Sequence, residues 1–198
     1  MQFPSHLATR LLLCCAVAVA PAFASAQDSA ASKPAKPAVG TPVSPSETYG
    51  KLLTMMEKEF VDAAEAMPED KFDYAPPATA GDFKGVRSFG GQVKHVADAN
   101  YYFFGGNMSE ADMKAKHEAM EKMTSKADIV RALKDSFAQA HTFVNGITAE
   151  NAFVTTEHGT RGGMASFGLA HMMDHYGQMV VYLRMNGIVP PASRSGGM

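Results

Sequence analysis

Apolar side chains recur every three or four positions in four stretches of the chain, which is the spacing that places them on one face of an α-helix. These stretches run over 46–67, 88–104, 125–146 and 164–186. In the second stretch the apolar stripe consists of Phe89, Gln92, His95, Val96, Ala99, Tyr102 and Phe103. The pattern shows no convincing strand pair and no internal repeat. Four amphipathic helices of this length predict an all-α, antiparallel four-helix bundle.

Residue types at the ends of these stretches support the helix assignment. Ser46 is the expected N-cap of the first helix, and Ser125 with Asp128 approximates a capping box before the third. Gly105 is expected to end the second helix, and Gly187 is the expected residue after the C-cap of the fourth. The polar segment between the second and third helices is predicted to be a connection with a short helix at most.

Composition distinguishes two segments that precede the four helices. The segment up to Ala26 resembles a secretory signal peptide, with a basic residue, an apolar run over 11–24 and a small-residue cleavage site; a retained N-terminal anchor is the alternative. Residues 27–45 contain four prolines and almost no large apolar side chain, which predicts a disordered linker. We therefore expect one folded domain over 46–192, a flexible tail over 193–198, and an exported protein, periplasmic or secreted.

Cysteine content and charge exclude several classes of site. Both cysteines, Cys14 and Cys15, lie in the predicted signal peptide, so the mature chain has no disulfide, cysteine nucleophile or thiolate metal site. Cleavage also removes Arg10 and no acidic residue, which leaves 17 of the 18 basic side chains against 20 acidic ones, a net charge of −3. This charge does not favour binding to nucleic acid or anionic membranes. No other segment is long and apolar enough to span a bilayer.

Two histidines stand four positions apart, His171 and His175, in the mostly apolar fourth stretch. Side chains at this helical spacing have Cβ atoms roughly 5–6 Å apart, which allows two imidazoles to bind one ion. His95 lies on the apolar stripe of the second helix and is the histidine most expected to point into the bundle. One metal ion would satisfy all three imidazoles together. The alternative is three separate core histidines, each satisfied by a hydrogen bond.

The remaining histidines of the mature chain are weaker candidates. His117 lies in a polar connection and is expected to be solvated, whereas His158 lies in a loop rich in glycine and threonine. His141 flanks the stripe of the third helix and is a candidate fourth ligand of a closed, structural site. The segment from 171 to 175 is not HExxH, because Met172 replaces the glutamate base, and this disfavours a thermolysin-like protease.

Three further polar residues are candidates for supporting the ligands: two aspartates that could orient a ligand imidazole or relay a proton, and one glutamine that could form a hydrogen bond behind the ligands. Asp98 lies three positions after His95, Asp174 lies directly before His175, and Gln178 lies three positions after it. For both aspartates the alternative is a solvated surface carboxylate.

Two segments that carry the histidines resemble the DinB/YfiT-like superfamily of four-helix-bundle proteins. They are "QVKHVADANYYFF", with His95, and "HMMDHYGQMVVYLRMNGIVPP", with His171 and His175. The stretch "MPEDKFDYAPP" is also similar, and the likeness covers 46–192. The resemblance implies an up-up-down-down style bundle whose three histidines hold a divalent ion, with zinc or nickel favoured over manganese or iron. Some relatives are transferases or isomerases that activate a small thiol.

The sequence therefore supports two hypotheses. The first is an exported, metal-dependent transferase or hydrolase that acts on a small molecule. The alternative is a non-catalytic metal- or ligand-binding bundle in the cell envelope. The fourth coordination position discriminates between the two hypotheses. A fourth protein ligand indicates a structural metal site, whereas an open position beside a pocket indicates a catalytic one. A homodimer through an outer helix face is left open, because the pattern identifies no such face.

Overall fold

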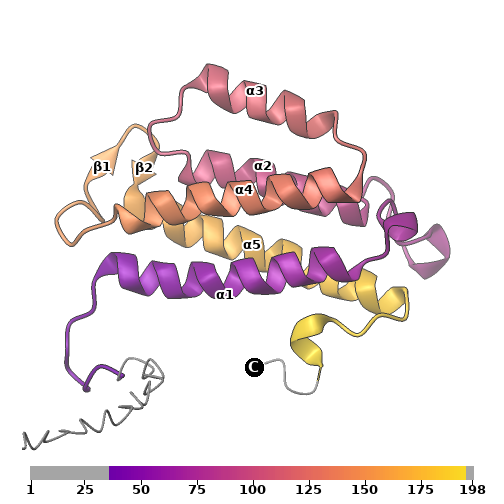
Figure 1. Cartoon of the computed structure of the whole chain (residues 1–198), viewed down its shortest axis with the longest axis horizontal. Helices are drawn as coiled ribbons and strands as arrows, with labels where there is room; N and C mark the ends of the chain where they lie inside the picture. The colour runs from indigo at the N-terminus through magenta and orange to yellow at the C-terminus, as the bar shows by residue number, and fades with distance from the viewer. Residues whose placement is uncertain (1–35, 195–198) are drawn as a thin grey trace, which may run out of the picture. The chain divides into compact units, whose positions relative to one another are not determined.

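The structure is a computed structural model that describes residues 36–194. The predicted signal peptide, positions 27–35 of the predicted linker and positions 195–198 of the predicted tail lie outside the described residues. The helical unit begins at Pro42 and is described by itself (Figure 1).

Five α-helices make up most of the described chain. They are α1 (Pro45–Ala66), α2 (Phe89–Phe104), α3 (Glu110–Glu121), α4 (Lys126–Asn145) and α5 (Arg161–Met185). Short 3₁₀ turns are η1 (Glu69–Lys71), η2 (Ala78–Ala80) and η3 (Pro191–Ser193), and the strands β1 (Thr155–Thr156) and β2 (Gly159–Thr160) form an antiparallel pair. The mostly helical class is thus confirmed. The expectation of no strand pair is wrong at this hairpin, whose two-residue strands are too short to give an alternating pattern.

The helix α1 begins earlier than predicted. Ser44, not Ser46, is its N-cap: the Ser44 hydroxyl accepts a hydrogen bond from the backbone N–H of Glu47 at 3.1 Å. Pro45 then occupies the first helical position, where its missing N–H costs nothing because that group has no partner within the helix. A proline at this position was part of the expected linker, and its role as a helix start explains the shift.

The helix α5 also begins before its predicted start at Met164. The hydroxyl of Thr160 caps it by accepting a hydrogen bond from the N–H of Gly163 at 3.0 Å. The cap therefore outweighs the low helix propensity of two glycines in the first turn. The predicted C-terminal end is confirmed, because Asn186 is the C-cap and Gly187 follows with a φ of +73°.

The segment between α2 and α4, predicted to be a connection with at most a short helix, contains the twelve-residue helix α3, which packs on α2. In Figure 1 it runs back along the bundle, so α4 starts at the same end as α2. The directions of α1, α2, α4 and α5 are thus up, down, down and up. This differs from the up-up-down-down order that the resemblance implied.

Contacts between the helices agree with these directions. Tyr49 and Ser166, near the starts of α1 and α5, share a hydrogen bond, so these two helices are parallel. Lys126, at the start of α4, donates to the carbonyl of Met67 at the end of α1, so these two are antiparallel. Around the bundle the order is α1, α4, α2 and α5, and α2 and α5 lie side by side and antiparallel.

A glycine brings α5 close to α2 at the level of the candidate site. A Cβ atom added to Gly168 would lie 2.5 Å from the ring of Phe104, which is fully buried. Gly168 precedes His171 by one turn, so this close approach sets the distance between the two helices that carry the histidines. Tyr102, expected on the buried stripe of α2, is instead 64% exposed, because the face toward α4 and α5 is formed by its neighbours Phe103 and Phe104.

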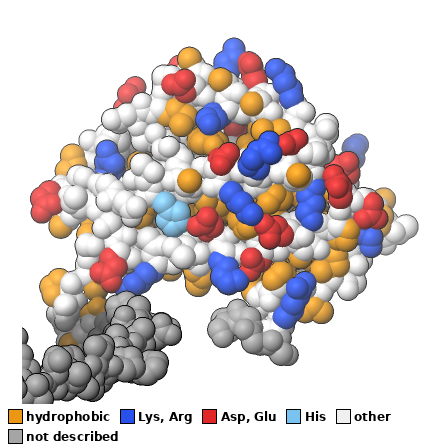
Figure 2. Space-filling view, in the orientation of Figure 1, with side chains coloured by type: hydrophobic (Ala, Val, Ile, Leu, Met, Phe, Trp, Pro, Cys, Tyr) orange, Lys and Arg blue, Asp and Glu red, His pale blue; other side chains and the backbone are white. Residues whose placement is uncertain are grey.

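The surface of the described unit carries both signs of charge. On the face shown in Figure 2, acidic and basic side chains are interspersed and form no continuous basic patch. Within 36–194, no helix combines the length and the apolar character that crossing a membrane requires.

Candidate metal centre

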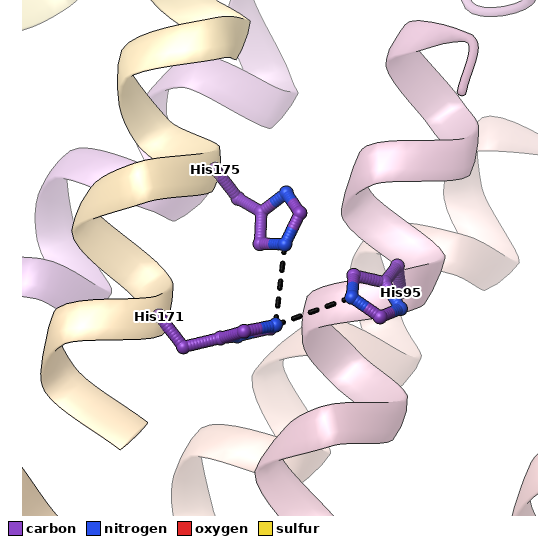
Figure 3. A group of neighbouring side chains, drawn as sticks. All are labelled: His95, His171 and His175. Carbon is purple, nitrogen blue, oxygen red and sulfur yellow. Dashed lines mark hydrogen bonds between the residues drawn. The ribbon is translucent and has the colours of Figure 1, made fainter. Parts of the chain in front are cut away.

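Two helices bring three imidazoles to one point. His95 extends from the middle of α2, and His171 and His175 extend from successive turns of the antiparallel α5 (Figure 3). His175 is buried, while His95 and His171 are half-buried. The i, i+4 spacing therefore places His171 and His175 side by side, as predicted, and the third imidazole comes from the facing helix.

The three Nε2 atoms converge. His171 Nε2 lies 3.2 Å from His95 Nε2 and 3.2 Å from His175 Nε2. One coordinating atom from each residue lies within 4.8 Å of the other two. Two nitrogens bound to one zinc ion at about 2.05 Å and near the tetrahedral angle lie about 3.3 Å apart. The observed spacing therefore fits a shared divalent ion.

A chain of hydrogen bonds fixes the tautomer of His175. Its Nδ1 donates to Gln92 Oε1 at 2.6 Å, which leaves the Nε2 lone pair free to face the other imidazoles. Gln92 Nε2 donates to Gln178 Oε1 at 2.8 Å, and Gln178 Nε2 donates to Asp174 Oδ2 at 3.3 Å. The proton on His175 Nδ1 is thus connected to a carboxylate through two amides, an arrangement that raises the basicity of a ligand imidazole.

His171 is not satisfied as an ordinary core histidine. Its Nδ1 is buried and has no hydrogen-bond partner within residues 36–194. Its Nε2 faces two other Nε2 atoms, and a single proton there serves only one of the two contacts. The contacts of this residue therefore do not match three separately satisfied core histidines, and they are compatible with an ion between the rings that uses all three Nε2 lone pairs.

The surroundings keep the imidazoles neutral, as metal binding requires. Burial is the largest cause for each of them. For His175, burial together with the charges of His171 and His95 lowers the pKa to about 4. The pKa of His95 is lowered by burial and then by Arg87. For His171 burial also lowers the pKa, and the nearby Asp174 opposes this shift.

These pKa shifts predict that the metal-free protein loses stability in mild acid. The unfolded chain protonates His175 near pH 6.5, but the folded chain does so only near pH 4. Between these values the unfolded state binds more protons, so the free energy of unfolding falls as the pH falls, by up to about 1.4 kcal/mol per pH unit for one histidine. Urea denaturation at several pH values between 7 and 4 measures this slope. In His175→Gln the slope should be shallower, and an unchanged slope would contradict the assignment.

The other histidines lie outside this group. His141 Nε2 lies 2.7 Å from Glu57 Oε2, between α4 and α1, and is not a fourth ligand. His158 lies in the turn of the hairpin and is exposed. His117 is exposed, as predicted, but its Nδ1 lies 2.9 Å from Asp98 Oδ2. Asp98 therefore orients His117 on α3 and is not hydrogen-bonded to a candidate ligand in the described chain.

One residue of this site was not identified from the sequence. Gln92 was placed on the stripe of α2 but was not singled out, although it is buried and makes direct contact with His175. The available signal was a polar amide one turn before His95 on an otherwise apolar face. Of the three polar candidates, Gln178 and Asp174 do lie in the hydrogen-bond chain that ends at Gln92 and His175.

Comparison with known proteins gives one family match. A family model described as the DinB superfamily matches residues 52–179, well over half of the chain, and the matched region contains all three histidines. No curated protein matches the chain.

Proposed function

The chain belongs to the DinB superfamily, and from this membership and the site geometry we propose that His95, His171 and His175 hold one divalent metal ion that acts on a small molecule. The convergence of three Nε2 atoms at 3.2 Å carries the proposal. Zinc and nickel are the favoured ions, and manganese and iron also accept imidazole ligands.

The surroundings of the three imidazoles favour catalysis over a purely structural role. Within 36–194, no fourth histidine, cysteine or carboxylate joins the group, so the ion would keep positions for water or substrate. His95 also borders two cavities, of about 480 and 550 Å³, which is the size range of small-molecule sites. When bound, such an ion supplies Lewis acidity and lowers the pKa of a coordinated water, hydroxyl or thiol.

His117 is the residue best placed to accept a proton from that group. It lines both cavities together with His95. Its Nδ1 faces Asp98, so Nε2 is left to exchange protons with the cavity. The hydrogen bond to Asp98, followed by the charge of that carboxylate, raises the pKa of His117, which makes its Nε2 a stronger proton acceptor. We propose metal-dependent group transfer, to or from a small thiol, or hydrolysis as the reaction class.

Export is part of the same proposal and rests on the signal-like segment up to Ala26. Fractionation of the cells followed by N-terminal sequencing tests it. We expect the protein in the envelope or the medium with Gln27 as its first residue, and an intact N-terminus in the cytoplasm would refute export.

Metal content of the tag-free protein tests the proposed function. We expect about one divalent ion per chain by mass spectrometry, present on isolation or after reloading with zinc, nickel or manganese. Added imidazole should then perturb the visible spectrum of the cobalt form, because it enters an exchangeable position. Absence of a stoichiometric ion after reloading would refute the metal site. A bound ion with no exchangeable position would favour the non-catalytic alternative.

Replacing Gln92 with leucine is expected to weaken metal binding about 10- to 100-fold while the helices are retained. Leucine removes the acceptor that holds His175 in its Nδ1–H tautomer, and it removes the donor to Gln178 Oε1. Competition with a chromogenic chelator measures the affinity, and circular dichroism measures the fold. Gln139→Leu is the matched control, because it also removes one amide contact, to the carbonyl of Phe104, away from the imidazoles. Equal affinities for the two variants would remove Gln92 from the site.

A further inference from the structure

An exposed arginine, Arg87, shares a cavity with one of the three imidazoles, that of His95. Arg87 directly precedes Ser88, the N-cap of α2, and its backbone carbonyl accepts a hydrogen bond from Tyr182 of α5 at 3.2 Å. Arg87 is therefore tied to both helices that carry the histidines. Its side chain lines the cavity of about 480 Å³ together with His95.

Arg87 has no carboxylate within ion-pair distance in the described part of the chain. The carboxylates nearest to the imidazoles are engaged elsewhere, since Asp98 pairs with His117 and Asp174 accepts from Gln178. The three imidazoles are neutral and bring no negative charge. A divalent ion and an unpaired guanidinium would therefore repel each other unless an anion lies between them.

The remaining charges of the cavity favour an anion with a single negative charge. Lys94 adds a second cation, but its Nζ is directed at the backbone carbonyls of Glu121 and Met123, at 3.4 Å each. The carboxylates of Asp73, Asp98 and Glu121 also line this cavity. Beside these carboxylates, an anion with one negative charge is repelled less than a dianion such as a phosphate monoester. A carboxylate needs only the two parallel N–H donors that one arginine supplies.

An apolar wall adjoins this charged cavity at His95. The cavity of about 550 Å³ shares His95, Asp98 and His117 with the first and is lined by Tyr101, Phe103 and Met113. A molecule that binds Arg87 at its negative end and extends past His95 would therefore meet an apolar surface.

We propose that the substrate is a small organic acid with an apolar body, whose carboxylate binds Arg87 beside the metal ion. This inference rests on the proposed function, since the anion is needed to separate Arg87 from the ion. It adds the substrate class and names Arg87 as the residue that selects it.

Ligand titration of the full, tag-free chain in its cobalt form tests the inference, with the visible spectrum as the readout. We expect benzoate to bind the wild type. The Arg87→Gln variant should bind benzoate about tenfold or more weakly, because it loses two charged hydrogen bonds to the carboxylate. Binding of neutral benzamide should be similar in both. Arg87→Gln should also bind cobalt itself more tightly, by roughly threefold or more, because a repelling charge is removed. Arg131→Gln, at an exposed arginine paired with Asp128, should match the wild type.

The possible results separate the two proposals. Failure of the wild type to bind cobalt would overturn the proposed function. Normal cobalt binding with equal benzoate affinities in wild type and Arg87→Gln would overturn the role of Arg87 alone. If Arg87→Gln binds both cobalt and benzoate more weakly than the wild type, Arg87 has a structural role, and this result would also overturn the inference. Tighter binding of phenyl phosphate than of benzoate would overturn the carboxylate class.

Discussion

His171→Ala is expected to abolish stoichiometric metal binding, with an affinity at least about 100-fold below that of the wild type. His171 Nε2 is the central atom of the cluster, at 3.2 Å from both His95 Nε2 and His175 Nε2. Loss of a residue that only supports a ligand costs about 10- to 100-fold, and loss of a ligand itself should cost no less than the upper value. Mass spectrometry of the purified protein and competition with a chelator measure the stoichiometry and the affinity.

His141→Ala is the control for this experiment. His141 is also a partly buried histidine that faces a carboxylate, Glu57, but it lies between α4 and α1 and outside the cluster. This variant should keep about one ion per chain, and His95→Ala should lose it as His171→Ala does. An ion retained by His171→Ala would contradict the three-histidine site. Circular dichroism separates this outcome from unfolding, and little loss of helix is expected because the buried Nδ1 of His171 has no partner to lose.

The bundle helices were predictable because each buries one continuous face. The pattern identified α2 and α4 to within a residue of their observed ends. The helix α3 was underestimated because only Met120 of its twelve residues is buried, so no apolar period marks it. It is held instead by contacts with α2, in which Lys116 lies over the ring of Tyr101 and His117 meets Asp98. Pairings of this kind depend on the tertiary fold, which a helical period does not encode.

The same distinction applies to the candidate site. The i, i+4 spacing put His171 and His175 on one face, and the apolar stripe of α2 singled out His95. The partners of Gln92 and Asp98 could not be predicted, because each partner lies on another helix. Arg87 gave no signal at all, since it lies outside the helix and belongs to no periodic pattern. The three histidines could therefore be predicted from the sequence, whereas the hydrogen bonds and charges around them could be identified only from the fold.

Phe137→Ala is expected to lower the free energy of unfolding of the metal-free protein by about 3–5 kcal/mol. Phe137 is fully buried on α4, and its ring lies 6.5 Å from that of Phe60 on α1. Such a loss is a large part of the roughly 5–15 kcal/mol that stabilises a typical domain. Urea denaturation followed by circular dichroism measures it. Phe153→Ala is the control: this phenylalanine is 75% exposed, and its replacement should change the stability by no more than about 0.5 kcal/mol.

Metal should offset much of that loss if it binds the folded chain alone. The three imidazoles belong to α2 and α5, so the ion would link two helices that separate on unfolding. At a free ion concentration of about 1,000 times Kd, the added stability is about 4 kcal/mol. Loaded Phe137→Ala should therefore unfold near the urea concentration of the metal-free wild type. Metal that binds this variant without raising its midpoint would show that the unfolded chain binds equally well, and the three histidines would then not form a site that depends on the fold.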